Sequence, residues 1–344
     1  MIELNELRSL LVENGIPSYR ANQVLHAVYK EGKANYDDMK VLPAFVKEYL
    51  EKNLPVLSIE NVKEEVSSNG STYKALFRLH DGKKIEAVLM RFKDGRKTVC
   101  VSSQVGCTLK CKFCATGKRG FKRDLTYEEI TDQVLYFQHL LKKEDSHVGN
   151  IVFMGMGEPF LNYENVMKAI SILNDPVAFN IGLRNITVST SGIVPQIEQF
   201  AEDAGQVNLA VSLHAPNDQI RTSIMPIAKK YSLEELMAAC KGYAEKTHRR
   251  VSYEYVMLRG VNDSDSNAHE LSRLLHGQLC HVNLIPYNET NVKGMKGSTK
   301  SRTEEFKKIL ELHKIPVTVR ISLGKDIKAA CGQLAGKSSC NSGQ

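Results

Sequence analysis

The chain passes from a strand-like run to a cysteine-rich loop in Thr98-Val-Cys-Val-Ser-Ser-Gln-Val-Gly-Cys-Thr-Leu-Lys-Cys-Lys-Phe-Cys114. The β-branched start is typical of a buried strand, and the three cysteines that follow have the spacing C-x3-C-x2-C. Three thiolates can bind three irons of a four-iron cluster, so that one iron stays open to a small molecule. This stretch therefore predicts a reactive iron–sulfur site at the end of a strand.

A zinc site and plain core burial are the alternatives for the cysteine triplet, and the residues alone leave both open. A structural zinc site needs four ligands, usually as paired Cys or His elements, and the chain contains no second C-x2-C motif or spaced His pair. Burial without a metal is plausible because free cysteine is often a core residue. Three cysteines within eight positions are dense for that alternative, so the cluster is favoured.

Strand-like and helix-like segments alternate along the rest of the chain. Thr126-Tyr-Glu-Glu129, for example, has the pattern of a capping box at the start of a helix over 126–141. Strands that alternate with helices indicate a parallel sheet or barrel. We expect an α/β fold with a partial barrel of about six parallel strands, in which the last of the strand-like runs is an accessory edge. The runs are 98–102, 150–154, 185–189, 207–213, 251–256, 281–285 and 317–321.

Polar or glycine-rich residues follow these runs where each expected strand ends. Parallel barrels place their active sites at the carboxyl ends of their strands. We therefore expect the cysteine loop and these polar clusters to face one mouth of the barrel. The clusters are 102–103, 155–158, 189–192, 212–214 and 287–288.

Further segments flank the barrel, which we place at 96–325. Residues 1–55 have the helical period of amphipathic segments and are expected to form an accessory domain that recognises a partner. Residues 56–95 alternate like strands around Asp81-Gly82, a strong hairpin signal. Residues 326–344 are expected to form a C-terminal loop that ends in a mobile Gly/Ser-rich tail.

The composition indicates a globular, cytoplasmic protein. The first residues lack the basic start and apolar run of a signal peptide, and no stretch has the length and apolarity of a membrane span. In a reducing compartment the eight cysteines are expected to be ligands, nucleophiles or core residues, with any disulfide transient. The net charge is +7, and basic side chains crowd at 110–123, which fits either a phosphate-bearing partner or a solvated surface.

Five motifs carry a resemblance to a known family that extends over nearly the whole chain. The cysteine triplet followed by a Gly-x-Gly-Glu-Pro motif resembles radical S-adenosylmethionine (SAM) enzymes, which implies a TIM-like radical SAM barrel. Three more motifs make the chain similar to the RlmN/Cfr family of RNA adenosine methyltransferases. The motifs are 107–114, Gly155-Met-Gly-Glu-Pro159, Cys100-Val-Ser-Ser-Gln-Val-Gly-Cys107, Ser212-Leu-His-Ala-Pro-Asn217 and Ala329-Ala-Cys-Gly-Gln-Leu334.

The resemblance implies a [4Fe-4S] cluster on the cysteine triplet, two SAM molecules per turnover and a chain of thiol chemistry. The cluster ligands would be Cys107, Cys111 and Cys114. Cys331 would be methylated by one SAM, and the second SAM would be cleaved to a radical that takes hydrogen from the new methyl group. After the carbon adds to adenine, Cys100 would release the product by forming a disulfide with Cys331.

Further roles come from the resemblance rather than from the residue pattern. Glu86 matches the base that removes the ring proton, whereas its strand pattern alone favours a carboxylate that points outward. Cys100, taken alone, reads as a core residue of a Val-rich strand, and His214 as a loop or core histidine. The implied SAM-binding residues are Gly157, Glu158, Ser189, Ser212, Leu213, His214 and Asn288.

The expected activity is methylation of C2 of an adenosine in the peptidyl-transferase region of 23S rRNA, with a tRNA anticodon-loop adenosine as a further candidate. A reducing electron donor such as flavodoxin is implied, and we expect a monomer without membrane association. Methylation at C8, which gives antibiotic resistance, is the alternative, because Tyr287-Asn-Glu-Thr-Asn291 and Arg320-Ile-Ser-Leu-Gly-Lys-Asp326 depart from the RlmN pattern. A non-catalytic RNA-binding protein with a metal-stabilised loop is the alternative of another class.

Overall fold

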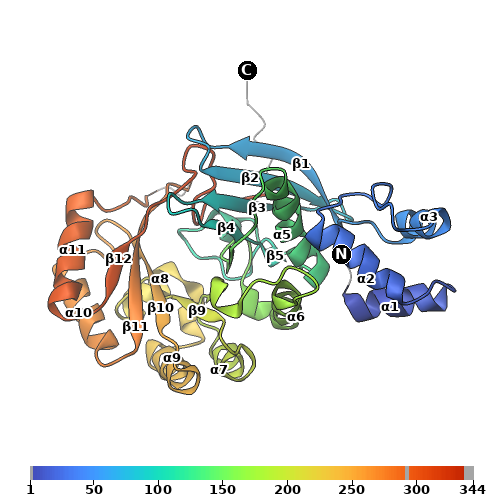
Figure 1. The fold of residues 1–344 in the computed structure, drawn as a ribbon. Coiled ribbons are helices and arrows are strands. Elements are labelled where there is room, and N and C mark those ends of the chain that lie inside the picture. Colours follow the sequence, from blue (N-terminus) through green and yellow to red (C-terminus); the bar gives the residue numbers. More distant parts are fainter. Residues whose placement is uncertain (1–2, 291–293, 337–344) are drawn as a thin grey trace.

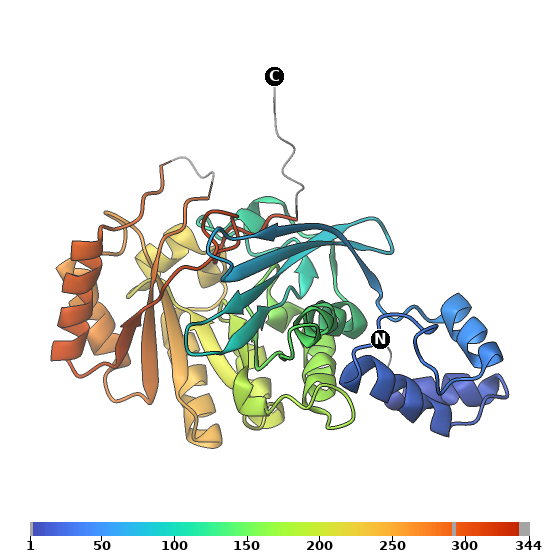
Figure 2. The ribbon, with the colours of Figure 1, turned by 45° about the horizontal axis from the view of Figure 1, so that its top comes forward.

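The computed structural model describes residues 3–290 and 294–336. Its main element is an open sheet with the strand order β1-β2-β3-β4-β7-β8-β9-β10-β11-β12. Figures 1 and 2 show this sheet as a curved arc with helices along its outer side. Among the described residues, every helix is too short or too polar to cross a lipid bilayer.

The part of the sheet from β4 to β12 is parallel throughout. Its strands coincide with the predicted runs, and the short β12 lies at the edge of the sheet, as expected for the last run. Val99, Ile151 and Val188 are completely buried, because strands of a parallel sheet are covered on both faces. The strands are β4 (Lys97–Cys100), β7 (Asn150–Phe153), β8 (Ile186–Thr190), β9 (Asn208–Ser212), β10 (Val251–Met257), β11 (Cys280–Pro286) and β12 (Val317–Val319).

Helices connect these strands, so that the carboxyl ends of all the parallel strands lie at one edge of the sheet. The predicted capping box is present: the Thr126 hydroxyl accepts from the Glu129 N–H, and the Glu129 carboxylate accepts from the Thr126 N–H. The helices are α4 (Ala115–Lys118), α5 (Tyr127–Lys142), α6 (Tyr163–Asn174), α7 (Val194–Asp203), α8 (Asp218–Ile224), α9 (Leu233–Thr247), α10 (Asp265–Leu275) and α11 (Lys300–Leu312), with 3-10 turns at Pro159–Leu161, Leu183–Asn185 and Pro226–Lys229.

An antiparallel extension continues the sheet beyond β4. It consists of β1 (Ile59–Val66), β2 (Thr72–Leu79) and β3 (Lys84–Arg91), and β3 pairs with β4. The turn between β2 and β3 contains Gly82 with φ +76°, which confirms the hairpin predicted there. A separate two-stranded ribbon, β5 (Gln104–Val105) with β6 (Arg123–Asp124), brackets the cysteine loop.

The N-terminal helices pack to one side of α5 (Figures 1 and 2). They are α1 (Leu4–Glu13), α2 (Tyr19–Leu25) with a π-helical turn at His26–Lys30, and α3 (Ala44–Asn53). The hydroxyl of Tyr127 in α5 donates to Glu6, and the His139 ring contacts the Val28 carbonyl through Nε2 at 3.1 Å. These contacts attach the helical segment to the α5 side of the sheet, away from β10–β12.

The C-terminal segment, residues 324–336, returns from β12 to the β2–β3 hairpin. Lys74 Nζ donates to the Ile327 carbonyl at 2.7 Å, and the Asp326 carboxylate accepts from the Ser68 N–H at 2.8 Å. The segment therefore crosses between the two outer parts of the sheet. The predicted mobile tail beyond Gly336, with Cys340, lies outside the described residues.

Candidate functional site

The cysteine triplet lies in the loop between β5 and α4. Cys107 and Cys111 are buried, and Cys114 is partly exposed. Gly106 allows the tight entry to this loop, because a Cβ atom there would lie 1.8 Å from the Gly120 carbonyl oxygen, and its φ is +81°. Only glycine fits this conformation and this close approach.

Burial controls the ionisation of Cys107 and Cys111. It raises the pKa of the Cys107 thiol to about 12 and that of Cys111 well above its ordinary value, and the neighbouring thiols add to both effects. In the described ranges, no three His, Cys, Asp or Glu side chains converge closely enough to hold a metal ion. A four-iron cluster places each thiolate on a different iron, and its metal charge stabilises the buried thiolates. Two buried thiols and a partly exposed one, spaced along one loop, thus suit a cluster better than a single zinc ion.

The glycine motif after β7 lies against the chain that enters the cysteine loop. A Cβ atom on Gly157, whose φ is +106°, would lie 2.8 Å from the Gln104 backbone nitrogen. The next residue, Glu158, is buried, and its carboxylate accepts from the Ser191 N–H at 2.8 Å and the Phe160 N–H at 3.2 Å. Burial raises the pKa of Glu158. Glu158 therefore ties the carboxyl end of β7 to that of β8.

The ends of β8 and β9 supply the serines. Ser189 and Ser212 are half-buried, whereas Leu213 is completely buried. His214 follows with a left-handed φ of 58°, and its Nδ1 accepts from the Val256 N–H at 3.0 Å. Burial lowers the pKa of His214 to about 3, so its ring is neutral. The ring packs edge-on against Phe113 of the cysteine loop, with the centroids 4.7 Å apart.

Asn288, after β11, has an unsatisfied acceptor. Its Nδ2 donates to the Cys331 carbonyl at 3.2 Å, but its buried Oδ1 has no partner among the described residues. Buried polar atoms are nearly always hydrogen-bonded, so Oδ1 is suited to accept from a ligand with a hydroxyl or amino group. The residues present at the carboxyl ends of β7, β8, β9 and β11 thus fit the polar groups of SAM.

Cys331 lies within electrostatic reach of Cys100, and neither cysteine forms a disulfide. Burial at the end of β4 raises the pKa of Cys100, and the charge of Cys331 raises it further. Cys331 is exposed as a residue, but protein atoms near its thiol desolvate it. This desolvation raises the pKa of Cys331, with a further contribution from Glu254. Both cysteines therefore hold their protons at neutral pH.

The strand pattern alone predicted that Glu86 points outward, and the structure shows instead that its side chain is buried. It is 3% exposed, because β3 lies between β2 and β4 and is covered on both faces. Its Oε2 accepts from the Ala335 N–H at 2.5 Å and the Gly336 N–H at 2.7 Å, and its Oε1 lies 3.3 Å from Lys74 Nζ. The Glu86 carboxylate thus fastens the chain that follows Cys331.

Glu254 is a residue that sequence analysis did not single out, although it lies within electrostatic reach of Cys331. Glu254 is buried in β10 and accepts from Asn283 Nδ2 at 2.8 Å. Burial raises the pKa of Glu254. The signal that could have found it is a lone carboxylate inside the apolar run Val251-Ser-Tyr-Glu-Tyr-Val256.

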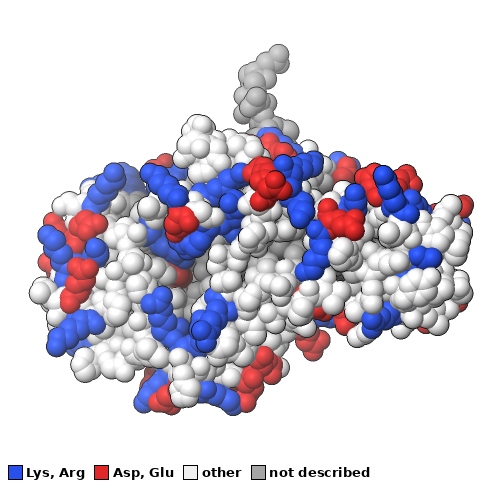
Figure 3. All heavy atoms as spheres, viewed as in Figure 1, with Lys and Arg blue, Asp and Glu red and all other residues white. Residues whose placement is uncertain are grey.

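The basic residues of the cysteine loop do not all belong to one surface. Arg123 is half-buried and makes ion pairs at 2.7 Å with both Asp81 and Glu129, so it holds β6 to the hairpin turn and α5. Figure 3 shows Lys and Arg side chains gathered around a hollow in the middle of one face. The exposed members of the loop, which we name the loop patch, are Lys110, Lys112, Lys118, Arg119 and Lys122.

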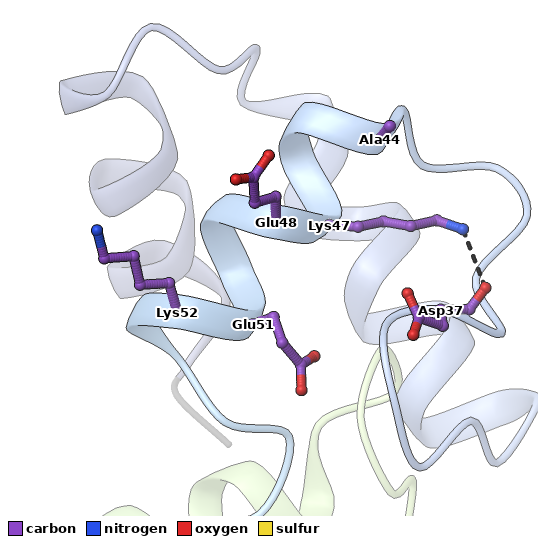
Figure 4. A pocket seen from close by; sticks show the side chains of 6 residues that line it. All are labelled: Asp37, Ala44, Lys47, Glu48, Glu51 and Lys52. Atoms are coloured by element: carbon purple, nitrogen blue, oxygen red, sulfur yellow. Dashed lines mark hydrogen bonds between the residues drawn. The ribbon is translucent and has the colours of Figure 1, made fainter.

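A shallow pocket in the N-terminal helices is separate from these residues (Figure 4). Lys47 spans it and donates to the Asp37 carbonyl at 3.0 Å. Its lining mixes acidic and basic side chains without a residue that sequence analysis singled out. The lining residues are Asp37, Ala44, Lys47, Glu48, Glu51 and Lys52.

The chain is similar to known proteins over nearly its whole length. Residues 101–271 match the model of the radical SAM superfamily. The chain is 46% identical over 331 residues to a protein of Clostridium novyi named "Probable dual-specificity RNA methyltransferase RlmN". The matched stretch covers 96% of this chain and 95% of that protein. A protein of the same name from Geobacillus kaustophilus is 44% identical over 336 residues, with 98% and 92% covered.

A solved structure extends the similarity to the whole described fold. The crystal structure of a radical SAM methyltransferase from Sphaerobacter thermophilus superposes with a TM-score of 0.95 at 48% sequence identity, and 98% of each chain is covered. The helical segment, the hairpin extension and the parallel sheet therefore occur together in both chains.

Proposed function

Because this chain belongs to the RlmN family of radical SAM methyltransferases, we propose that it methylates C2 of an adenosine in the peptidyl-transferase region of 23S rRNA. A tRNA anticodon-loop adenosine is the proposed second substrate, in keeping with the dual specificity in the relatives' name. The observation that carries the proposal is the proximity of the Cys331 segment to the cysteine loop and to Cys100. It lies within electrostatic reach of Cys100 and Cys114, and the Gly332 carbonyl accepts from the Ala115 N–H at 2.7 Å.

The cysteine triplet would hold the [4Fe-4S] cluster, and Gly157, Glu158, Ser189, 212–214 and Asn288 would hold SAM. When bound, this pair supplies the one-electron chemistry that a methyl transfer to an electron-poor adenine carbon requires. The chain itself contributes a close backbone approach at Gly157, the acceptor Oδ1 of Asn288 and a neutral ring at His214. We propose that two SAM molecules are used per turnover and that a reducing protein such as flavodoxin supplies the electron.

Cys331 would carry the methyl group, since it is the solvent-reached member of the Cys100–Cys331 pair. Once its methyl carbon is bonded to adenine, the Cys100 thiolate would attack the Cys331 sulfur. The sulfur–carbon bond would break with its electron pair left on the carbon, which would take up a proton and become the methyl group of the RNA, and a disulfide would remain. A reductant would then return both cysteines to thiols.

Glu86 would serve as the base for the adenine ring proton only after a local rearrangement. Its Oε2 is engaged by two backbone N–H groups and its Oε1 by Lys74. Release of Ala335 and Gly336 would free Oε2, while Lys74 would stay beside Oε1. We therefore propose that the C-terminal segment moves when RNA enters.

The N-terminal residues 1–55 are proposed to recognise RNA, together with the hairpin extension over 56–95. Residues 96–325 would form the catalytic barrel and 326–344 the loop that carries Cys331. The loop patch would contact phosphates, which suits its exposed positive charge. We propose that the protein acts as a cytoplasmic monomer.

The test is mass spectrometry of nucleosides from 23S rRNA and tRNA in cells that lack their own modifying enzyme and express this chain. A Cys331→Ala variant is the control. 2-Methyladenosine that depends on Cys331 supports the proposal for each RNA in which it is found. 8-Methyladenosine would show that C8, the alternative carbon, is methylated instead of C2. If a cluster-loaded protein yields neither product, the proposed RNA substrate is wrong.

A further inference from the structure

Arg221 is a buried charged residue that the proposed reaction leaves without a role. It lies in α8, directly after the strand-end segment 212–217, and none of its surface is exposed to solvent. Arginine is almost never fully buried unless it is paired. The partners of this side chain therefore decide what its charge does.

The hydrogen bonds of the guanidinium go to neutral carbonyls. Nη2 donates to the Ser191 carbonyl at 2.7 Å and to the Ser212 carbonyl at 3.4 Å. Nε donates to the Leu213 carbonyl at 3.3 Å. Nη1 is buried and has no partner within 3–290 and 294–336. These bonds join the ends of β8 and β9, but they bring no anion to the guanidinium.

This buried positive charge lies next to the cysteine loop. The Lys112 N–H donates to the Ile224 carbonyl at 2.9 Å, which fastens the loop to the end of α8. Three groups favour the protonated guanidinium through their negative charge. Cys111 has the largest effect, followed by Asp218 and Cys240. Burial, the largest effect, lowers the pKa of Arg221 to about 10, so the side chain stays charged at neutral pH.

We propose that Arg221 is a positioning residue that places a buried positive charge behind Cys111 and thereby favours the reduced state of the cluster bound there. A cluster held by thiolates becomes more negative when it gains an electron, and a cation in the protein interior stabilises that charge more strongly than one in water. The inference rests on the cluster of the proposed function and is independent of the RNA substrate and of the methylated carbon.

The test compares the midpoint potential of the reconstituted cluster in wild type, Arg221→Gln and Arg221→Lys by redox titration with electron paramagnetic resonance. Arg221→Gln is expected to shift the potential to more negative values. Arg221→Lys is expected to keep most of the wild-type potential while it lowers the unfolding temperature, because lysine keeps the charge and loses the bonds to the carbonyls. Lys241→Gln on α9 is the matched control, and its exposed, solvent-screened charge is expected to leave the potential unchanged.

Iron and sulfide content and the circular dichroism spectrum establish that each variant is loaded and folded. An unchanged potential in folded, loaded Arg221→Gln would overturn the proposal and leave Arg221 a structural tie between β8 and β9. If that variant does not fold, Arg221→Lys carries the test, since it keeps the positive charge and loses the bonds to the carbonyls. A potential close to wild type in that variant supports the proposal, and a large negative shift contradicts it. None of these readouts requires RNA methylation.

Discussion

At the scale of single residues, the raised pKa of Cys331 predicts how its reactivity depends on pH. Desolvation, followed by the negative charge of Glu254, favours the thiol form. Only the thiolate is a nucleophile, and its fraction grows about tenfold per pH unit below the pKa. We expect alkylation of Cys331 by iodoacetamide in the cluster-free protein to accelerate in this way above neutral pH, as measured by peptide mass spectrometry.

Glu254→Gln provides the control for this prediction. It removes a charge that raises the pKa of Cys331, so alkylation at neutral pH should become faster. A rate that does not change with pH, or a slower rate in Glu254→Gln, would contradict the assigned environment of this thiol.

Gly157→Ala is predicted to destabilise the protein. The new Cβ atom would meet Gln104 at contact distances below 3.0 Å, on a backbone with φ +106°. Strain of this kind costs about 1–3 kcal/mol, which a denaturant titration of the free energy of unfolding would measure. Gly242→Ala is the matched control in helix α9, with no atom within 4 Å of its new methyl group. It should stabilise the protein by about 0.5–1 kcal/mol, and equal effects of both changes would refute the prediction.

At the scale of elements, Glu86 on β3 is predicted to hold the C-terminal segment in place. Glu86→Gln removes the charge that strengthens the bonds to the Ala335 and Gly336 N–H groups. Hydrogen bonds to charged groups contribute about 1.5–3 kcal/mol, so local opening should become roughly ten- to hundredfold more frequent. Hydrogen exchange of the 330–336 peptide measures this opening. Glu60→Gln, which breaks an exposed ion pair with Arg78 on the neighbouring strands, should leave that peptide unchanged.

The elements also separate what the sequence could predict from what it could not. Parallel strands consist of local β-branched runs, and the Thr126 capping box and the Asp81-Gly82 turn depend on neighbours in sequence, so each was predictable. The path of 324–336 was not, because this segment has no period of its own. It is placed by distant partners such as Lys74, Thr116 and Glu86.

The candidate site divides in the same way. The positions of Cys107, Cys111 and Cys114 follow from a local motif, whereas the burial of Glu86 depends on distant contacts such as those with Ala335 and Gly336. Arg221 reads as an ordinary charged helix residue, because only the folded chain encloses it. Contacts between distant segments therefore determine the charges around the site.

At the scale of the whole molecule, the loop patch is predicted to supply much of the salt dependence of RNA binding. Each phosphate contact releases counterions, so binding weakens as salt rises, with a slope that reflects the number of contacts. A triple Lys118→Gln, Arg119→Gln, Lys122→Gln variant should bind the 23S rRNA fragment more weakly and with a shallower slope in fluorescence anisotropy. Lys241→Gln, on the exposed surface of α9, should leave the slope unchanged. If the salt dependence of binding has the same slope in the triple variant and in wild type, the RNA does not contact the loop patch.

The bond from Gly336 to Glu86 joins positions 250 residues apart in the chain. Contacts of such separation form late in folding, since a long stretch must be ordered before they stabilise anything. During synthesis, the sheet and the cysteine loop emerge well before Cys331 does. The segment that carries Cys331 can consequently take its place beside Glu86 only after the sheet and the cysteine loop have been made.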